Sequence, residues 1–339
     1  MSFKSEFEFV KYCLQRRKDT RFVKNVMSIG ADSSLVNMVA MGDERNSHPL
    51  YFVAPDASGS GFFADHNRLL CYLYYADFFG LTPVVEYSPG YCYAEKEAVN
   101  GTENPFEYYF EQPSGVSLEQ MKKARTVIKS RKENAALAGQ LNETGYGYDF
   151  SDEYLDELGR ISGKYIRLNN HVNRWMTEQI EDVIGNRKTL GVHVRGTDFK
   201  RNYKGHPVKV TTQEYLEQAK KVFVEKEYEA IFLATDDAWA LMMFRELFGD
   251  KLRYYSDVVR SDGDETVMKS QVSRKNHHYL LGLEVLRDMY TLAACDGFVA
   301  GLSQVSFAAR IQKKAESKEY VDMVILDKGM NSTGEICKV

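Results

Sequence analysis

The sequence lacks the features that mark several classes of protein. Across 339 residues, Lys and Arg number 44 and Asp and Glu 48, so a net charge of −4 gives no overall positive field to attract nucleic acid. The longest apolar stretches, residues 69–81 and 291–302, are interrupted by Asp77 and Asp296 and are shorter than the roughly 18 residues of a membrane helix. The amino-terminal residues mix charges of both signs and precede no apolar signal core. We therefore expect neither a membrane span nor export.

Cysteine is also scarce. The five cysteines include no Cys-x-x-Cys pair and leave an odd one over, which indicates reduced thiols in a cytoplasmic protein rather than a disulfide framework. A hydrophobic fraction of 44% is typical of a globular protein with a substantial core. At about 150 residues per domain, the length predicts two domains.

The first part of the chain predicts a βαβ unit. An apolar run at 51–54 leads through a glycine-containing loop into a helix at 62–79, which Gly80 ends before a strand at 81–87. Residues 87–109 are rich in Tyr, Pro, Gly and Asn and are interpreted as an irregular, surface-accessible connection. Two helices, at 117–140 and 152–180, are expected to follow.

A second alternating series begins at residue 189. Strands are predicted at 189–195, 230–234, 252–255, 297–300 and 321–326, with helices at 212–224, 238–247, 276–295 and from 303 onward. Alternation of this kind predicts parallel sheets with right-handed crossovers. The expected fold is therefore α/β, with two Rossmann-like domains, residues 1–183 and 184–339, facing a cleft.

Ligands of open parallel sheets collect beyond the carboxyl ends of the strands. The segment at 189–195 ends in His193-Val194-Arg195, where the two polar residues alternate onto one face. Arg195 could grip a phosphate through its guanidinium fork while His193 donates to a nearby oxygen. The alternative is an Arg195–Asp198 ion pair that only holds the loop together.

Polar residues follow two further strands. Asp236 and Asp237 could form a paired-carboxylate metal site, but the pair lacks the additional oxygen ligands that a divalent ion requires. Ser303 opens a helix, whose amino terminus is suited to an anion, although a serine here is also an ordinary helix cap.

Taken in order, three segments resemble the donor-site motifs of the fucosyltransferase superfamily, which includes the alpha-1,6-, alpha-1,2-, nodulation and protein O-fucosyltransferases. The segments are 193–198, 232–237, and 288–290 with 296–299 and 303–305. Each lies at a predicted strand end or within the last strand–helix pair. The resemblance is good over about 190–312 and loose before that.

This resemblance implies a GT-B architecture and inverting, metal-independent transfer of fucose from GDP-fucose, with no other cofactor. Arg195 would bind the β-phosphate, together with Ser303 and the adjacent backbone N–H groups of Gln304 and Val305. His193 and Asp288 would recognise the guanosine end, with Asp288 accepting from guanine donors. Asp236 and Asp237 would order the donor loops.

The sequence departs from the alpha-1,6 pattern at three positions. Gly196 replaces a second arginine, Phe199 stands where a lysine is expected, and Tyr203 stands where a glutamate, a candidate base, is expected. Inversion requires a base for the acceptor hydroxyl, or a departing diphosphate that collects the proton. Asp198 is the first candidate base in this chain and His206 the second.

The first half offers weaker signals. Gly59 and Gly61 form a loop without long side chains, where a sugar or phosphate can approach the backbone. The residues that follow, at 66–68, are His, Asn and Arg, which could face the cleft or serve only the helix. A basic helical stripe is either solvated or in contact with an anionic acceptor or a membrane surface; it comprises Lys122, Arg125, Lys129 and Lys132.

The leading interpretation is a bacterial, cytoplasmic fucosyltransferase that acts on the hydroxyl of a saccharide or glycoconjugate. Two alternatives remain open: a glycosyltransferase with another nucleotide sugar, and a nucleotide-sugar-binding protein without turnover. The acceptor, its linkage and the oligomeric state are not encoded in any recognisable pattern.

Overall fold

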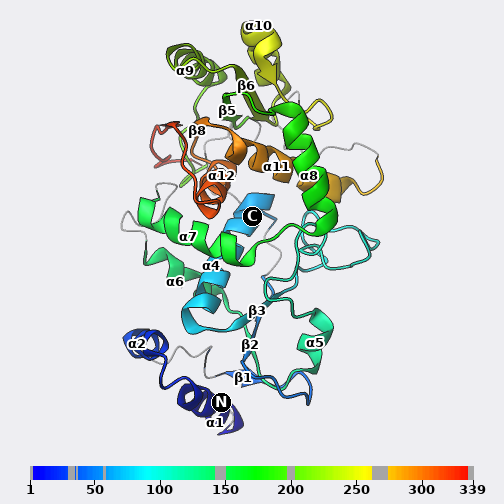
Figure 1. Cartoon of the computed structure of the whole chain (residues 1–339), viewed down its shortest axis with the longest axis vertical. Coiled ribbons are helices and arrows are strands. Elements are labelled where there is room, and N and C mark those ends of the chain that lie inside the picture. The colour runs from blue at the N-terminus through cyan, green and yellow to red at the C-terminus, as the bar shows by residue number, and fades with distance from the viewer. Residues whose placement is uncertain are drawn as a thin grey trace.

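The computed structural model describes residues 3–29, 35, 37–55, 59–141, 150–196, 203–261 and 274–334. It contains two β-sheets at opposite ends of the long axis, with several helices between them (Figure 1). The elements of these residues are α1 (Phe3–Gln15), α2 (Thr20–Ile29), β1 (Met38–Val39), β2 (Leu50–Val53), α4 (Phe62–Phe79), β3 (Thr82–Val85), α5 (Leu118–Lys123), β4 (Val127–Lys129), η1 (Lys132–Ala135), α6 (Ala136–Gly139), α7 (Asp152–Tyr165), α8 (Asn170–Val183), β5 (Thr189–Val194), α9 (Thr212–Glu225), β6 (Ala230–Thr235), α10 (Ala238–Phe248), η3 (Gly249–Lys251), β7 (Leu252–Arg253), α11 (His277–Ala294), β8 (Gly297–Gly301), α12 (Gln304–Ala315) and β9 (Asp322–Leu326).

The first sheet has the strand order β1-β4-β2-β3. Strand β2 runs parallel to both β3 and β4, whereas β1 is antiparallel to β4. Helix α4 crosses between β2 and β3 and has the predicted limits, because Gly61 caps its start in an extended conformation and Gly80 ends it at a φ of 65°. The predicted βαβ unit is confirmed.

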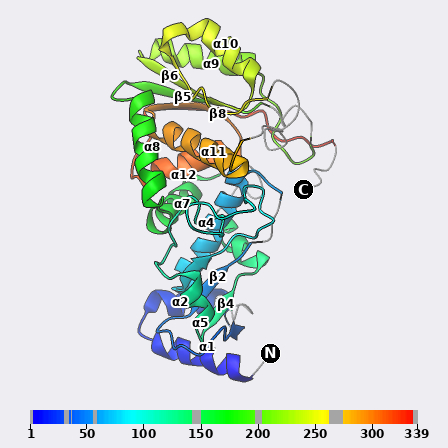
Figure 2. The ribbon, with the colours of Figure 1, turned by 90° about the vertical axis from the view of Figure 1, so that its right-hand side faces the viewer.

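The second sheet is parallel throughout, in the order β7-β6-β5-β8-β9. Strands β5, β6 and β8 are buried along their whole length, as the continuous apolar runs predicted. Helices α9 and α10 lie at the far end of the molecule, beyond this sheet, while α11 and α12 lie on the side of the first half (Figure 2). The α/β fold with parallel sheets is confirmed.

Two predictions for the first half are wrong. The segment 117–140 is not one helix: α5 ends at Lys123, and residues 127–129 form β4 between β1 and β2. The basic stripe predicted on that helix therefore does not exist as one face, and the membrane contact that depended on it has no support. The segment 152–180 is likewise two helices, α7 and α8, with Asn169 capping the second through the backbone N–H of Val172.

The tyrosine-rich connection at 87–109 is irregular, as predicted, and residues such as Lys96 and Glu97 are exposed, but its tyrosines are not. Its tyrosines are buried, including Tyr93, Tyr108 and Tyr109 at 5%, 1% and 1% exposure. Their rings pack into one apolar core that also contains residues of the second half, such as Phe298. The connection is a packed layer between the two halves.

Tyr109 is central to this contact. Its ring stacks on that of Tyr279 in α11, with centroids 5.3 Å apart, and its hydroxyl donates to the Tyr279 carbonyl at 2.9 Å. A Cβ added at Gly282, one turn further along α11, would overlap the Tyr109 hydroxyl. Phe62, at the start of α4, packs edge-on against Tyr109 as well. The halves are thus joined by close aromatic packing.

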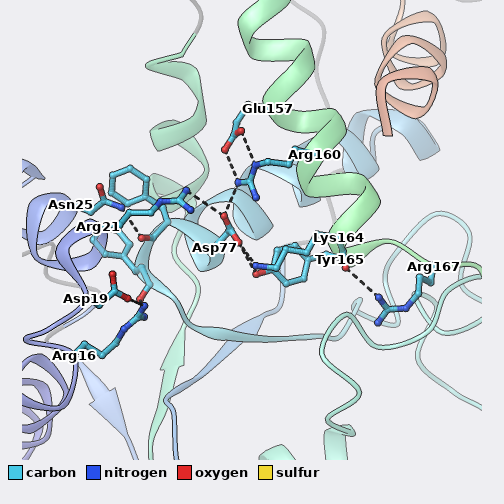
Figure 3. A network of polar contacts seen from close by, with 12 residues as sticks. Arg16, Asp19, Arg21, Asn25, Asp77, Glu157, Arg160, Lys164, Tyr165 and Arg167 are labelled. Carbon is cyan, nitrogen blue, oxygen red and sulfur yellow. Dashed lines mark hydrogen bonds and ion pairs between the residues drawn. The ribbon is translucent and has the colours of Figure 1, made fainter. Parts of the chain in front are cut away.

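An ion-pair network surrounds Asp77 on α4 (Figure 3). Its buried carboxylate accepts from Arg160 at 2.6 Å, from Lys164 at 2.5 Å and from the Tyr165 hydroxyl at 3.1 Å. Arg21 of α2 approaches it at 3.6 Å. Burial raises the pKa of Asp77, but the cations outweigh this effect and the pKa lies below its usual value. The network connects α2, α4 and α7.

The predicted boundary between the two domains, at residues 183 and 184, falls between α8 and β5. Helices from the two sides of this boundary are in contact, and the division into two domains stays a prediction. Helix α7 packs on α12, and α8 packs on α11. None of the described helices has the length and apolar character needed to cross a bilayer.

Four of the five cysteines lie in the described residues. Cys13, Cys71, Cys92 and Cys295 are free thiols.

Candidate functional site

Ser303 lies between β8 and α12 and caps the helix. Its hydroxyl accepts from the Ser306 backbone N–H at 3.1 Å, while its own backbone N–H donates to the Ser306 hydroxyl at 3.0 Å. The helix-cap role is therefore confirmed. The N–H groups of Gln304 and Val305 belong to the first turn, where no acceptor exists within a helix, so they are candidate donors to an anion at the start of α12.

The hydroxyl of Ser303 also meets His193, which lies near the end of β5. The His193 Nδ1 atom is 3.2 Å from the Ser303 oxygen, and the histidine is 5% exposed. Burial and the nearby Arg195 charge lower the pKa of His193 to about 3, so its imidazole is neutral at pH 7. The structure thus brings together His193 and Ser303, which the sequence placed at two separate strand ends.

Arg195 follows β5 directly and is half-buried. Its charge lowers the pKa of His193, and it opposes the rise in pKa that burial causes for Tyr215 in α9 and Tyr93 in the first half, so Arg195 lies near all three. Burial raises the pKa of Tyr93 to about 12, against the opposing effect of Arg195. The arginine therefore lies where the second half meets the first.

Tyr93 connects Arg195 to the glycine loop. Its hydroxyl accepts from the Phe62 backbone N–H at 3.1 Å, at the beginning of α4. Gly61 precedes Phe62 as the cap of this helix, and a Cβ at Gly61 would meet no atom of the described residues within 4 Å. Gly59 has a φ of 66°, which favours glycine. The loop with Gly59 and Gly61 thus comes close to Arg195, with open space beside it.

The second turn of α4 contacts the first turn of α12. Asn67 donates through Nδ2 to the backbone carbonyl of Gln304 at 3.0 Å and to its side-chain oxygen at 2.9 Å. Asn67 therefore positions the residue that follows Ser303. His66 instead packs against Phe63 and Phe110, and burial lowers its pKa to about 4, so it belongs to the core.

The paired aspartates after β6 hold neighbouring backbone. Asp236 accepts from the Gly196 N–H through Oδ1 at 3.0 Å, and Asp237 caps α10 by accepting from the Trp239 N–H at 2.8 Å. A Cβ at Gly196 would overlap the Asp237 Cβ, so this packing favours glycine at position 196. Among the described residues, no cluster of His, Cys, Asp and Glu is arranged to hold a metal ion.

Asp288 lies on α11 and is 8% exposed. Burial raises its pKa to about 7, although the charges of Arg260 and Arg287 oppose the shift. Arg287 is held by Gln179 at 2.7 Å and by Asp257 at 2.5 Å. No hydrogen bond to the Asp288 carboxylate occurs within the described part of the chain, so its oxygens are available to a ligand.

Sequence reasoning did not identify Arg260. Its guanidinium donates to the backbone carbonyls of Val258 at 3.1 Å and Tyr255 at 2.9 Å, which fixes it close to Asp288. Its Nε is buried and has no hydrogen-bond acceptor among the described residues. The loop after β7 has no recognisable sequence motif. Only its position in the folded structure relates this arginine to the site.

Backbone contacts connect the two groups of residues. Ser261, next to Arg260, donates from its N–H to the Asp236 carbonyl at 2.9 Å, and its own carbonyl accepts from the Ala238 N–H at 3.1 Å. Asp236 in turn holds Gly196, next to Arg195. Backbone contacts at the carboxyl edge of the second sheet therefore link the loop of Arg195 to the loop of Arg260, and Asp288 lies near Arg260 on α11.

Two predicted site residues are not placed with this edge. Asp198 lies outside the described residues. His206 lies beside Tyr203, with ring centroids 5.5 Å apart, and its carbonyl accepts from the Asn331 N–H at 2.9 Å. The choice of a catalytic base therefore stays a prediction.

Comparison with known proteins yields structural likenesses alone. No family model matches the chain, and no curated protein matches it significantly. It is similar to the NodZ alpha-1,6-fucosyltransferase soaked with GDP-fucose (17% identity, 78% of this chain and 92% of that chain, TM-score 0.44). It is also similar to NodZ from Bradyrhizobium (18%, 79% and 93%, 0.45) and to POFUT1 in complex with GDP (11%, 83% and 99%, 0.49). At such identities and scores, the likeness assigns no role to any residue.

Proposed function

We propose that the chain is a glycosyltransferase that transfers fucose from GDP-fucose to a saccharide hydroxyl, with inversion and without a metal ion. The observation that carries this proposal is the convergence of Arg195, His193 and the Ser303-capped start of α12 at the edge of one parallel sheet. An arginine beside a helix amino terminus is suited to stabilising a departing diphosphate.

In this proposal Arg195 binds the β-phosphate of the donor through charge-assisted hydrogen bonds. The N–H groups of Gln304 and Val305 add further donors, held in place by the Asn67 contact with Gln304. His193 is neutral, and if Ser303 donates to its Nδ1, its Nε2 carries the proton and donates to an oxygen of the donor.

Guanine would lie beside Asp288 on α11. The ionised Asp288 carboxylate accepts hydrogen bonds, and guanine offers adjacent N–H donors that adenine and uracil do not present in the same pattern. Arg260, anchored on two carbonyls, would interact with the rest of the nucleotide. The second half, 184–339, then binds the donor, with Gly59 and Gly61 of the first half also close to it, and the first half, 1–183, binds the acceptor.

The proton of the acceptor hydroxyl needs a destination. Asp198 is the first candidate base and His206 the second. The departing diphosphate, neutralised by Arg195 and the helix start, is a third possibility. Asp236 and Asp237 order the loops around this centre and bind no metal.

A panel of nucleotides tests the donor assignment. GDP at 100 times its dissociation constant stabilises the folded chain by about 2.7 kcal/mol, and UDP should not. Protection by UDP rather than GDP would indicate another nucleotide sugar. Transfer from GDP-fucose to a panel of glycans, with and without EDTA, tests the reaction. Binding without slow hydrolysis or transfer would instead indicate a nucleotide-sugar-binding protein, and loss of activity in EDTA would contradict the metal-free mechanism.

A further inference from the structure

A second candidate site lies at the opposite end of the first half. A cavity of about 420 Å³ lies between α1 and the segments that lead into β2 and β4. Pro49 and Thr126, which line it, directly precede these strands, whereas the glycine loop near Arg195 follows β2. Figure 2 shows α1 at the end of the molecule away from the second sheet. The cavity is therefore separate from the proposed donor site.

The lining is rich in positive charge. It includes Lys11, Arg45 and Arg125 but only one acidic residue, Glu8. Glu8 lies 3.6 Å from Lys11, so it compensates that lysine. Neither Arg45 nor Arg125 has an ion pair or a side-chain hydrogen bond with the residues that the structure describes. Two cations thus face the cavity without a countercharge.

The two arginines are held close together by backbone hydrogen bonds. The Arg125 N–H donates to the Glu44 carbonyl at 2.7 Å, so residues 45 and 125 lie on adjacent segments. Asn46 closes the same contact by donating to the Thr126 carbonyl at 2.9 Å and accepting from the Thr126 N–H at 3.0 Å. Like charges on neighbouring strands are destabilising unless an anion lies between them. The backbone pairing thus holds the two arginines on adjacent segments that line the same cavity, which suits an anion.

The remaining lining indicates what carries that anion. The side chains of Gln15 and Ser47 make no hydrogen bond within the described ranges, and the Phe7 ring is 62% exposed. Polar groups and an exposed ring suit the hydroxyls and the apolar face of a sugar. A volume of about 420 Å³ also falls in the range of small-molecule sites, about 300–1,000 Å³, and greatly exceeds the volume of a phosphate ion.

We propose that this cavity binds a saccharide that bears a carboxylate or phosphate group, with Arg45 and Arg125 as the anion ligands. The binding does not depend on the donor assignment. If the proposed function holds, the site would retain an anionic part of the acceptor or of its product at a distance from the reaction.

Calorimetric titration of the full chain tests this proposal. The probes are a glucuronate-containing tetrasaccharide, glucose monophosphate, a neutral tetrasaccharide and inorganic phosphate. The Arg45→Gln/Arg125→Gln variant removes the two cations, and Lys220→Gln/Lys221→Gln on the exposed face of α9 removes the same charge elsewhere. Melting temperatures and single Arg45→Gln and Arg125→Gln variants exclude misfolding as the cause of any loss.

We expect at least one anionic saccharide to bind, with affinity that falls about tenfold or more in the double arginine variant and stays unchanged in the lysine control. The neutral tetrasaccharide should bind more weakly. Binding of neither anionic saccharide, equal affinity in the arginine variant, or inorganic phosphate binding as tightly as the saccharides would overturn the proposal. GDP affinity, measured in parallel, should not change in the arginine variant, so a failure of the donor assignment is seen separately.

Discussion

The titration of Asp288 gives a quantitative test of nucleotide recognition. If this carboxylate accepts hydrogen bonds from guanine, only its ionised form binds. Burial raises its pKa to about 7, so about one eleventh of the molecules are ionised at pH 6 and about ten elevenths at pH 8. Because apparent affinity scales with the competent fraction, GDP should bind about tenfold more tightly at pH 8 than at pH 6.

The Asp288→Asn variant is the matched control. The phosphates of GDP also titrate in this range, but they do so equally with both proteins. The ratio of wild-type to variant affinity therefore isolates Asp288 and should rise about tenfold between pH 6 and pH 8. The variant should also bind GDP more weakly at pH 8 without a change in acceptor affinity.

Calorimetry in buffers of different ionisation enthalpy gives a second measurement. At pH 6, binding selects the ionised carboxylate, so close to one proton should be released for each GDP bound by the wild type. The variant should release correspondingly fewer. A constant affinity ratio across pH, or the same proton release from both proteins, would refute the role of Asp288 in guanine recognition.

Three further predictions concern the reaction and the fold. If the proposed function holds, Arg195→Ala removes a ligand of the departing diphosphate and should lower turnover by at least about 10²–10³-fold with an unchanged circular dichroism spectrum; unchanged turnover would contradict the donor placement. Gly196→Ala should lower the free energy of unfolding by about 1–3 kcal/mol in urea titrations, because its Cβ would overlap Asp237, and a fully stable variant would show that the loop adapts. Asp77→Asn should lower the free energy of unfolding by about 2–3 kcal/mol at pH 7, because a buried carboxylate loses its bonds to half-exposed cations. As a control, Glu119→Gln removes the carboxylate of an exposed ion pair and should have no measurable effect. The Asp77 contribution should be lost as pH falls through its lowered pKa, and a stability difference that persists at strongly acidic pH would argue against it.

The second half could be predicted from the sequence almost element by element. Its strands are short apolar runs buried on both faces, and its helices begin at residues such as Ser303 and Asp237 whose side chains cap them. Local sequence carries these signals. The positions of the candidate residues at strand ends could be predicted for the same reason, because they follow from the strand limits alone, whereas their roles stay predictions.

The first half was less predictable because tertiary pairing decides its structure. Residues 126–128 are Thr, Val and Ile, which favour a strand, and they pair between β1 and β2 rather than continuing α5. The tyrosine-rich segment looks like a loop, yet its hydroxyls find partners such as the Phe62 N–H, which permits burial. Arg260 and Tyr93 belong to the candidate site through contacts between segments that are distant in the sequence. Local sequence patterns do not predict such contacts.

The stacking of Tyr109 on Tyr279 has a consequence for modular exchange between enzymes of this architecture. Gly282 in α11 leaves just enough room for the Tyr109 hydroxyl, so the packing surface of each half depends on a residue of the other half. Grafting a foreign second half that lacks this glycine onto the amino-terminal half would place a side chain against the Tyr109 hydroxyl. Specificity is therefore more readily altered by changing loops at the sheet edges than by recombining whole halves.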